Sequence, residues 1–317
     1  MNNEELLAKR WKKTDELLVS FKRVVTSLTK NLRNDILDLF DSVDIALSDL
    51  NKPVSNREKN RLNKLIQEWR KNGINNAYLT YKIKTKKRKM PYSDYLELIL
   101  LGIYAVYMQT VYEKSKETFK KISHDAVAQA KKERKKEPAV PFYITWNFIE
   151  ELLIVNTLQK PFYNYLQLLC QTNSDEAYKV FIQSKQVSGN AKTSEDGLDI
   201  LMQKQENRLI DIHDDKESGV ITDLGRQLWN EMYLKPYRDE DVQVRFVAEI
   251  DRATTEMCKG LDGMLFYTKR WNRYYRYSAL DKRDVLYTTF GLKAGENLPP
   301  INNHFHWCRS TITYLLD

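Results

Sequence analysis

Apolar side chains recur every three or four residues along the first fifty residues of the chain. They occupy Leu7, Trp11, Leu18, Phe21, Val25, Leu28, Leu32, Ile36, Leu39, Val43 and Leu47. This spacing places them on one face of an α-helix. A helix with a single apolar face is not stable alone in water, so we expect this apolar stripe to pack on other helices or on a neighbouring chain.

Start and stop signals predict further helices after this segment. Ser55 and Glu58 have the spacing of a capping box and predict a helix that runs to about Lys71. A second long helix is predicted after Pro91, and Pro138 marks the region in which it ends. Two shorter helical patterns follow, at 146–157 and 161–171. The segment 82–89, between the predicted helices, is interpreted as a basic loop or a strand pair.

The pattern changes in the second half of the chain. Polar residues dominate 173–194, which predicts a hinge or an exposed connection. Helical spacing returns at 198–212 and 222–233. Val242, Val244 and Phe246 then alternate as in a strand, and two more strand candidates lie at 264–267 and 309–315.

The patterns together predict a mainly α protein with two main parts. A helical region with long helices covers residues 1–172, and it carries a basic face and a docking surface for partners. A hinge or exposed connection at 173–194 leads to a smaller α+β domain at 195–317. The low content of turn-forming residues, with 10 Gly and 8 Pro among 317 residues, also favours long helices over a many-stranded sheet.

Composition restricts the class of protein. The most apolar run, 96–111, contains Glu97 and falls short of the roughly 20 apolar residues that a membrane span requires, so we expect no contact with a membrane. The first residues do not have the pattern of a secretory signal. The three cysteines are scattered, which favours a reducing compartment such as the cytoplasm in which the protein is made.

The net charge of +8 is concentrated in one segment. Residues 81–137 hold 15 Lys or Arg and 7 Asp or Glu, so the remaining residues sum to zero. Segregated charge predicts a basic face that contacts the phosphates of double-stranded DNA. The candidate residues are Lys82, Lys84, Lys86, Lys87, Arg88, Lys89, Lys131, Lys132, Arg134, Lys135 and Lys136. The alternative is that these residues form solvated helix faces.

Aromatic and basic residues also alternate at 268–277. This pattern suits stacking against nucleic acid or contact with a partner protein. Internal packing is a third interpretation, and partner contact and internal packing together are favoured over nucleic acid for this stretch.

Two blocks near the C-terminus have a distinctive order. The first block runs from Asp251 through Cys258 and Leu261 to Gly263. The second block runs from Gly295 to Thr311 and contains the motif residues Pro299, Pro300, His304, His306, Cys308 and Arg309. Together they resemble the Mu F-like minor head proteins of tailed bacteriophages, which are also called head morphogenesis proteins. The chain departs from that pattern in the spacing of Arg and Thr after Asp251 and in having two His before the last Cys.

The resemblance implies a non-catalytic minor capsid protein that acts in head assembly. Such proteins are associated with the portal vertex, enter the procapsid during assembly, and in some members bind DNA. The expected partners are the portal protein, other head proteins and packaged DNA. The expected location is the virion, in the capsid interior or at the portal vertex, and the host cytoplasm during assembly.

The same residues allow a metal site. Cys258, His304, His306 and Cys308 form a His₂Cys₂ set of the kind that binds structural zinc. The favoured alternative is a metal-free core corner in which the cysteines are small buried apolar residues, because no short Cys-x-x-Cys hairpin is present.

Enzymatic interpretations are weaker. Cys258 or Cys308 with a histidine has the types of a nucleophile pair, but no oxyanion loop or orienting group is recognisable. Asp211, His213, Asp214 and Asp215 form an acidic cluster, which is interpreted as a solvated helix end rather than a nuclease site. Two other functions compete with the head protein: a sequence-independent nucleic-acid-binding protein, and a phage-borne metal-dependent nuclease or toxin domain.

Overall fold

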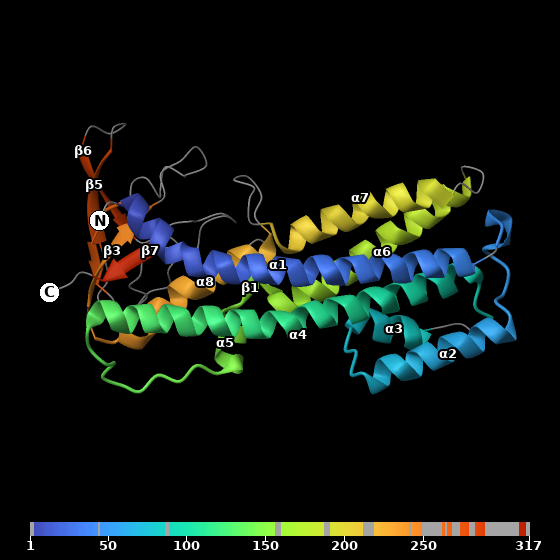
Figure 1. Ribbon diagram of the computed structural model, residues 1–317, viewed down its shortest axis with the longest axis horizontal. Helices are drawn as coiled ribbons and strands as arrows, with labels where there is room; N and C mark the ends of the chain where they lie inside the picture. The colour runs from blue at the N-terminus through green and yellow to red at the C-terminus, as the bar shows by residue number, and fades with distance from the viewer. Residues whose placement is uncertain are drawn as a thin grey trace. The chain divides into compact units, whose positions relative to one another are not determined.

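The computed structural model describes residues 3–43, 45–85, 89–155, 160–186, 191–211, 219–240, 242–248, 262–263, 265–267, 273–278, 283–288 and 311–314. This part of the chain is mainly helical, as the sequence predicts (Figure 1). Its α-helices are α1 (Asn3–Ser42), α2 (Asn56–Lys71), α3 (Ala77–Thr85), α4 (Tyr92–Arg134), α5 (Trp146–Leu152), α6 (Phe162–Gln186), α7 (Ala191–Leu209) and α8 (Val220–Leu234). Two short 3₁₀ helices, η1 (Leu47–Asp49) and η2 (Lys235–Tyr237), accompany them.

The strands in the described part form small antiparallel sheets. They are β1 (Ile154–Val155), β2 (Lys160–Pro161), β3 (Gln243–Val247), β4 (Leu265–Tyr267), β5 (Arg273–Ser278), β6 (Arg283–Thr288) and β7 (Thr311–Tyr314). β1 pairs with β2, β5 pairs with β6, and the third sheet has the order β4-β3-β7. The strand candidates of the sequence analysis at 242–246, 264–267 and 309–315 correspond to β3, β4 and β7. The β5–β6 hairpin was not predicted.

The chain divides into two compact units that do not follow the predicted boundaries. Unit 1 contains residues 1–21, 116–161 and 209–317, and unit 2 contains residues 22–115 and 162–208. Each unit therefore combines segments that are distant in sequence, whereas the prediction placed the boundaries of its regions after residue 172 and before residue 195. The prediction placed the boundaries where polar residues dominate, whereas in the structure α1 and α4 each contribute residues to both units.

The predicted hinge at 173–194 is wrong for most of its length. Helix α6 continues through this segment to Gln186, and α7 begins at Ala191. Ala177, Phe181 and Ser184 are buried at helical spacing, so the segment does have an inner face. The small and polar residues on that face hid the helical period in the sequence. Figure 1 shows α6 and α7 side by side, and Lys204 Nζ lies 3.6 Å from Glu176 Oε1 between them.

The apolar stripe of the first helix belongs to the core. In unit 2, Val25, Leu32, Ile36 and Leu39 are each less than 5% exposed. The Thr29 hydroxyl lies 2.9 Å from the Tyr107 hydroxyl of α4, and burial raises the pKa of Tyr107 to about 12. The stripe packs mainly within the chain, so it is not available as a whole for docking on a partner.

A close contact between α2 and α4 fixes the packing of unit 2. Gly102 of α4 faces the ring of Trp69, which is 7% exposed. A Cβ atom at position 102 would lie 2.1 Å from ring atoms of Trp69, a distance that no carbon pair tolerates. The glycine therefore allows the tryptophan to lie against the backbone of α4.

The start of α2 has the predicted capping box. In it the N–H of Ser55 donates to Glu58 Oε2 at 2.8 Å, and the N–H of Glu58 donates to Ser55 Oγ at 3.3 Å.

The interpretation of 82–89 as a loop or strand pair is wrong for its first residues. Helix α3 extends to Thr85 and carries Lys82 and Lys84. Residues 86–88 lie outside the described part.

Helix α4 is long enough and apolar enough to cross a membrane, by length and composition only, contrary to the expectation for 96–111. However, 72% of its most apolar window is buried inside the protein, as in the core helix of a folded domain.

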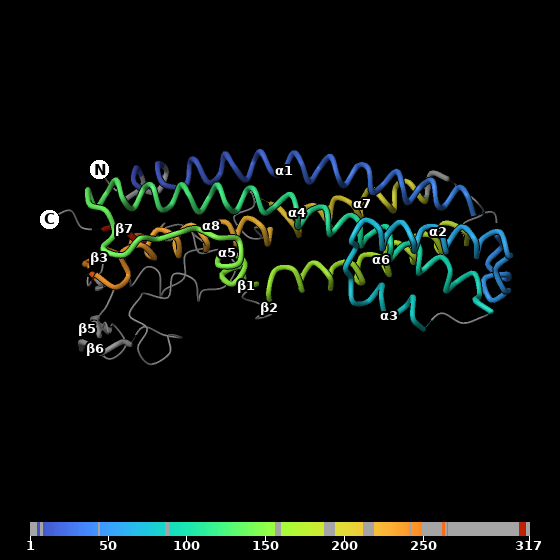
Figure 2. Tube along the Cα trace, turned by 90° about the horizontal axis from the view of Figure 1, so that it is seen from below, coloured from blue at the N-terminus to red at the C-terminus, as the bar shows by residue number. Residues whose placement is uncertain are grey.

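In unit 1 the sheet β4-β3-β7 has a buried face and a defined register. Val244 and Phe246 of β3 are fully buried, and all four residues of β7 are buried. Val247 pairs with Thr311 at one end of the β3–β7 ladder. Figure 2 shows β7 beside the N-terminal end of α1 and the C-terminal end of α4, where the Arg10 guanidinium donates to the Ile312 carbonyl.

The contact between Gly102 and Trp69 gives a direct test of this packing. Replacing glycine by alanine inside a helix ordinarily stabilises it by about 1 kcal/mol. We expect Gly102→Ala instead to lower the free energy of unfolding by about 1–3 kcal/mol, because the new methyl group overlaps the Trp69 ring. Urea denaturation measures this change.

The matched control is the same substitution in a Trp69→Leu background. Leucine vacates the space of the ring, so Gly102→Ala should cost less there than in the unmodified chain. An equal cost in both backgrounds would contradict the contact.

Candidate functional site

Most of the motif residues that carry the family resemblance lie outside the described part. These are Asp251, Cys258, Leu261, Pro299, Pro300, His304, His306, Cys308 and Arg309. The predicted zinc set lies entirely among them, so it stays a prediction. Elsewhere in the described residues, no group of three or more His, Cys, Asp or Glu is placed to hold a metal ion.

Gly263 is the motif residue that the structure describes. Its φ of 78° lies in the left-handed region that favours glycine. Its N–H donates to the Phe246 carbonyl at 2.9 Å, and the neighbouring Asp262 carboxylate accepts the N–H of Ala248 at 2.9 Å. This glycine therefore forms a turn that returns the chain against β3, which is a structural role.

The strands that flank the two motif blocks belong to one sheet. β3 precedes the first block, β4 follows it, and β7 begins with the last residue of the second block. β3 pairs with both β4 and β7. In this register Val247, at the end of β3, lies opposite Thr311, at the start of β7. The first block thus leaves the sheet at the same end at which the second block enters it.

A buried ion pair lies beside this sheet. The Arg10 side chain is 2% exposed, and its Nη2 lies 2.7 Å from Glu133 Oε1 at the end of α4. Glu133 also accepts from the Tyr233 hydroxyl of α8 and from Thr313 Oγ1 of β7, the latter at 3.3 Å. Gln129 Nε2 donates to the same carboxylate at 2.7 Å. Helices α1, α4 and α8 and strand β7 all meet at this carboxylate.

Aromatic rings enclose the ion pair. The Arg10 guanidinium lies 4.9 Å from the centroid of the Trp229 ring and 4.4 Å from that of Tyr233, and these two rings stack at 5.0 Å. Tyr233 in turn lies 4.9 Å from Tyr314 of β7. Burial raises the pKa of the Tyr233 hydroxyl well above its usual value. The hydroxyl therefore stays protonated and donates a hydrogen bond to Glu133.

A pocket of about 520 Å³ opens beside the ion pair within unit 1. We call it the basic pocket. It is lined by Leu6, Lys9, Arg10, Lys13, Asp125, Gln129, Lys132, Glu133, Lys135, Trp229, Arg245, Thr313 and Tyr314. Six of these residues are cations and two are carboxylates, so the lining has a formal charge of +4.

The basic residues at 131–136 are adjacent in sequence but make different contacts in the structure. Lys131 Nζ lies 2.5 Å from Glu137, and Lys136 Nζ lies 3.3 Å from Glu240. The Arg134 guanidinium lies 5.7 Å from the centroids of the Tyr237 and Tyr314 rings. The remaining two residues of this group, Lys132 and Lys135, line the basic pocket.

The more N-terminal basic residues lie in unit 2. Lys82 Nζ is 2.9 Å from Glu97 Oε2, and this hydrogen bond raises the pKa of Lys82. Lys84 and Lys89 are exposed, and Lys86, Lys87 and Arg88 lie outside the described residues.

Sequence reasoning missed four cations of the basic pocket. Lys9, Arg10 and Lys13 lie on α1, more than one hundred residues before the end of α4, and Arg245 lies on β3. A local count of charge could not join segments so distant in sequence. One weak signal was available, because Arg245 lies on the face of the strand opposite to the apolar Val244 and Phe246.

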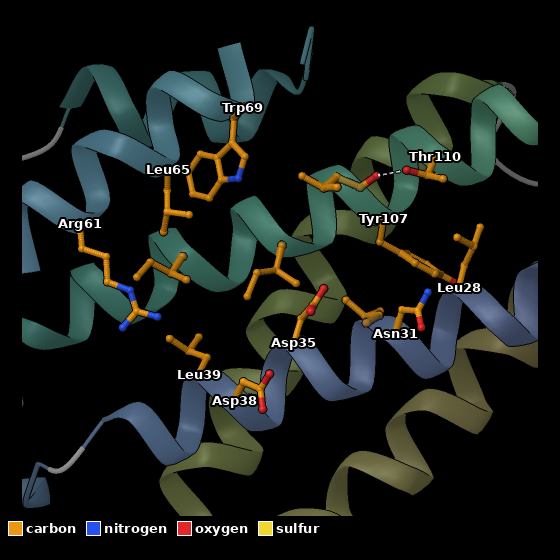
Figure 3. Close-up of a pocket in the computed structure, with 14 residues that line it drawn as sticks. Leu28, Asn31, Asp35, Asp38, Leu39, Arg61, Leu65, Trp69, Tyr107 and Thr110 are labelled. Carbon is orange, nitrogen blue, oxygen red and sulfur yellow. Dashed lines mark hydrogen bonds between the residues drawn. The ribbon is translucent and has the colours of Figure 1, made fainter. Parts of the chain in front are cut away.

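Unit 2 contains a second concavity, a groove of about 370 Å³ between α1, α2 and α4 (Figure 3). Its apolar floor is formed by Leu28, Leu32, Leu39, Leu65, Trp69, Ile99, Ile103 and Val106. Asp35 and Asp38 of α1 and Arg61 of α2 contribute its charged side chains. Burial, and then the neighbouring Asp38 carboxylate, raise the pKa of Asp35. The groove can accept an apolar side chain that is next to a cation.

The remaining candidates for chemistry do not form a reactive site in the described part. Cys170 is buried, and burial raises the pKa of its thiol, which donates to the Leu101 carbonyl at 3.6 Å. Such a thiol is a poor nucleophile. Of the predicted acidic cluster, Asp211 is described, whereas His213, Asp214 and Asp215 lie outside the described residues.

The buried ion pair predicts a strong and specific effect on stability. Replacing Arg10 by Met leaves the Glu133 carboxylate without its cation, and we expect the free energy of unfolding to fall by about 3–5 kcal/mol. Adding Glu133→Gln removes the unpaired charge and should recover part of the loss. Thermal and urea denaturation of the single and double variants measure both effects.

Lys121→Met is the matched control, because Lys121 pairs with Glu117 on the surface of α4, where the two side chains are 57% and 74% exposed. It should change the free energy of unfolding by less than about 0.5 kcal/mol. A double variant no more stable than Arg10→Met would contradict the account of the pair.

No family model, curated protein or solved structure matches this chain. Membership of the family that the two motif blocks resemble is therefore a proposal.

Proposed function

We propose that the chain is a non-catalytic minor capsid protein of a tailed bacteriophage, which acts in procapsid assembly at the portal. The observation that carries this proposal is the order of the two motif blocks at the end of the chain, from Asp251 to Gly263 and from Gly295 to Thr311. It acts in the host cytoplasm during assembly and then in the virion, in the capsid interior or at the portal vertex.

The strand pairing supports this proposal. The two blocks are separated by 31 residues, yet the strands that flank them pair in one sheet, β4-β3-β7. The left-handed turn at Gly263 explains one motif residue in structural terms. The C-terminal region is proposed to be a small α+β module, in which α8 and this sheet pack together through Tyr233 and Tyr314.

The groove in unit 2 is proposed as the surface that the portal protein contacts. Most of the apolar stripe of α1 is buried within the chain, and its residues Leu28, Leu32 and Leu39 form part of the groove floor. The groove combines an apolar floor with the carboxylates of Asp35 and Asp38. Charge complementarity selects as its occupant a portal helix that presents an apolar side chain next to Lys or Arg.

The first alternative is a sequence-independent nucleic-acid-binding protein without a role in a capsid. The positive charge of the basic pocket favours it, and binding to DNA alone does not distinguish the two functions. Association with the portal protein distinguishes them.

The second alternative is a phage-borne metal-dependent nuclease or toxin domain. Metal-dependent cleavage of DNA or RNA that is lost on substitution of Asp214 or His306 would favour this second alternative.

The proposed function predicts where the chain is found. Purified procapsids and mature particles of the phage that encodes it should be probed for the chain on gels, with the portal protein as the reference. We expect the chain in one or both kinds of particle at low copy relative to the major capsid protein. Absence from both would contradict the proposed function.

Co-expression with the portal protein tests the groove. Val106 lines the groove and Val24 does not, and both side chains are 37% exposed on helices of unit 2. Val106→Asp should abolish co-purification with the portal, whereas Val24→Asp should leave it unchanged. Equal retention of the portal by both variants would show that the groove is not the contact.

A further inference from the structure

We propose that the basic pocket of unit 1 is a binding site for phosphate groups. The pocket is defined by residues of α1, the end of α4, α8, β3 and β7. It does not depend on the proposed role in a phage head, because its charges and geometry belong to this chain alone.

Internal ion pairs already engage both carboxylates of the pocket. Lys13 Nζ lies 2.5 Å from Asp125 Oδ1, which leaves this carboxylate little capacity for another cation. Trp229 Nε1 donates to the other oxygen of Asp125 at 3.2 Å. Glu133 is held by Arg10 at 2.7 Å. The negative charges of the lining are therefore neutralised from within.

Four cations of the pocket remain without a carboxylate partner among the described residues. These are Lys9, Lys132, Lys135 and Arg245. Four positive charges around one cavity repel one another, so an anion that enters the cavity lowers the free energy of the site. The carbonyl end of α4 contributes only about half of a negative charge nearby, which does not offset four cations.

Arg245 supplies an independent sign of a missing ligand. Its Nε is buried and has no hydrogen-bond acceptor in the part of the chain that the structure describes. A buried donor without an acceptor is unfavourable unless a ligand satisfies it. In the β3–β7 ladder Arg245 pairs with Thr313, which also lines the pocket, so both side chains stand on the same face of the sheet.

The combination of donors fits a phosphate ligand better than it fits a carboxylate ligand. A guanidinium offers two parallel donors to an oxyanion, and lysines add point charges around it. A single carboxylate would neutralise one of the four cations, whereas a phosphate dianion, a pyrophosphate or neighbouring phosphodiesters neutralise two or more. Phosphate groups of this kind come either from free small molecules or from a nucleic-acid backbone, and the test below separates the two sources.

The test measures binding of two probes to the full-length chain. The first probe is pyrophosphate, followed by isothermal titration calorimetry, and the second is a short fluorescent DNA duplex, followed by anisotropy. The pocket variant is Lys132→Gln/Lys135→Gln. The control is Lys120→Gln/Lys121→Gln, which removes the same charge from exposed positions of α4 outside the pocket. All four lysines are exposed, so both variants should fold, and circular dichroism checks this.

We expect the pocket variant to bind at least one probe about tenfold or more weakly, and the control to remain within about twofold of the unmodified chain. For the duplex, measured between about 50 and about 200 mM salt, the slope of log affinity against log salt should become shallower by about 1.8 in the pocket variant. Asp125→Asn removes a negative charge from the same pocket and should tighten binding of the same probe.

The outcomes separate the sources and decide the proposal. Selective loss of pyrophosphate binding identifies a free phosphate ligand, and selective loss of duplex binding identifies a nucleic-acid backbone. Equal weakening in the pocket variant and the control, or no binding of either probe to the unmodified chain, overturns the proposal. Neither probe involves a portal protein, so failure here leaves the proposed function intact, and failure of portal co-purification leaves this site intact.

Discussion

Unit 1 is organised by the ion pair between Arg10 and Glu133. Apolar burial supplies most of the favourable free energy of folding, but it has no direction and does not by itself fix a register. A carboxylate withdrawn from water requires specific donors, and Glu133 obtains them from α1, α8 and β7 as well as from its own helix. Arg10 also donates to the carbonyl of Ile312, a residue 302 positions further along the chain. This requirement ties the first helix to the last strand, because moving either one leaves a buried charge or carbonyl without its partner.

The same arrangement also determines where positive charge gathers in unit 1. Carboxylates inside unit 1 pair with Lys131, Lys136, Arg10 and Lys13, whereas Lys9, Lys132, Lys135 and Arg245 lie around one pocket. The N-terminal helix contributes to this pocket although its basic and acidic residues nearly balance, with eight Lys or Arg and seven Asp or Glu in 3–42. The proposed phosphate site and the proposed portal contact belong to different compact units, and both are built partly from α1.

Local signals in the sequence predicted local structure well. The capping box at Ser55 and Glu58, the long helices and the strand that contains Val244 and Phe246 follow from spacing alone, and the structure confirms them. The hinge prediction failed because α6 buries small and polar residues such as Ala177 and Ser184, which leave no apolar period. The two units, the ion pair and the basic pocket could not be predicted, because each depends on contacts between segments more than one hundred residues apart. The motif residues that carry the family resemblance lie mainly outside the described part, so that interpretation stays a prediction.

Hydrogen exchange of the full-length chain tests the central claim that Arg10 and Glu133 hold the C-terminal strand on the helices of unit 1. Mass spectrometry would compare the unmodified chain with Arg10→Met under native conditions. The account predicts that peptides from α8 and β7 lose protection, whereas peptides from α2 and α6, in unit 2, keep theirs. Unchanged protection of β7 in the variant, or an equal loss in both units, would contradict the claim.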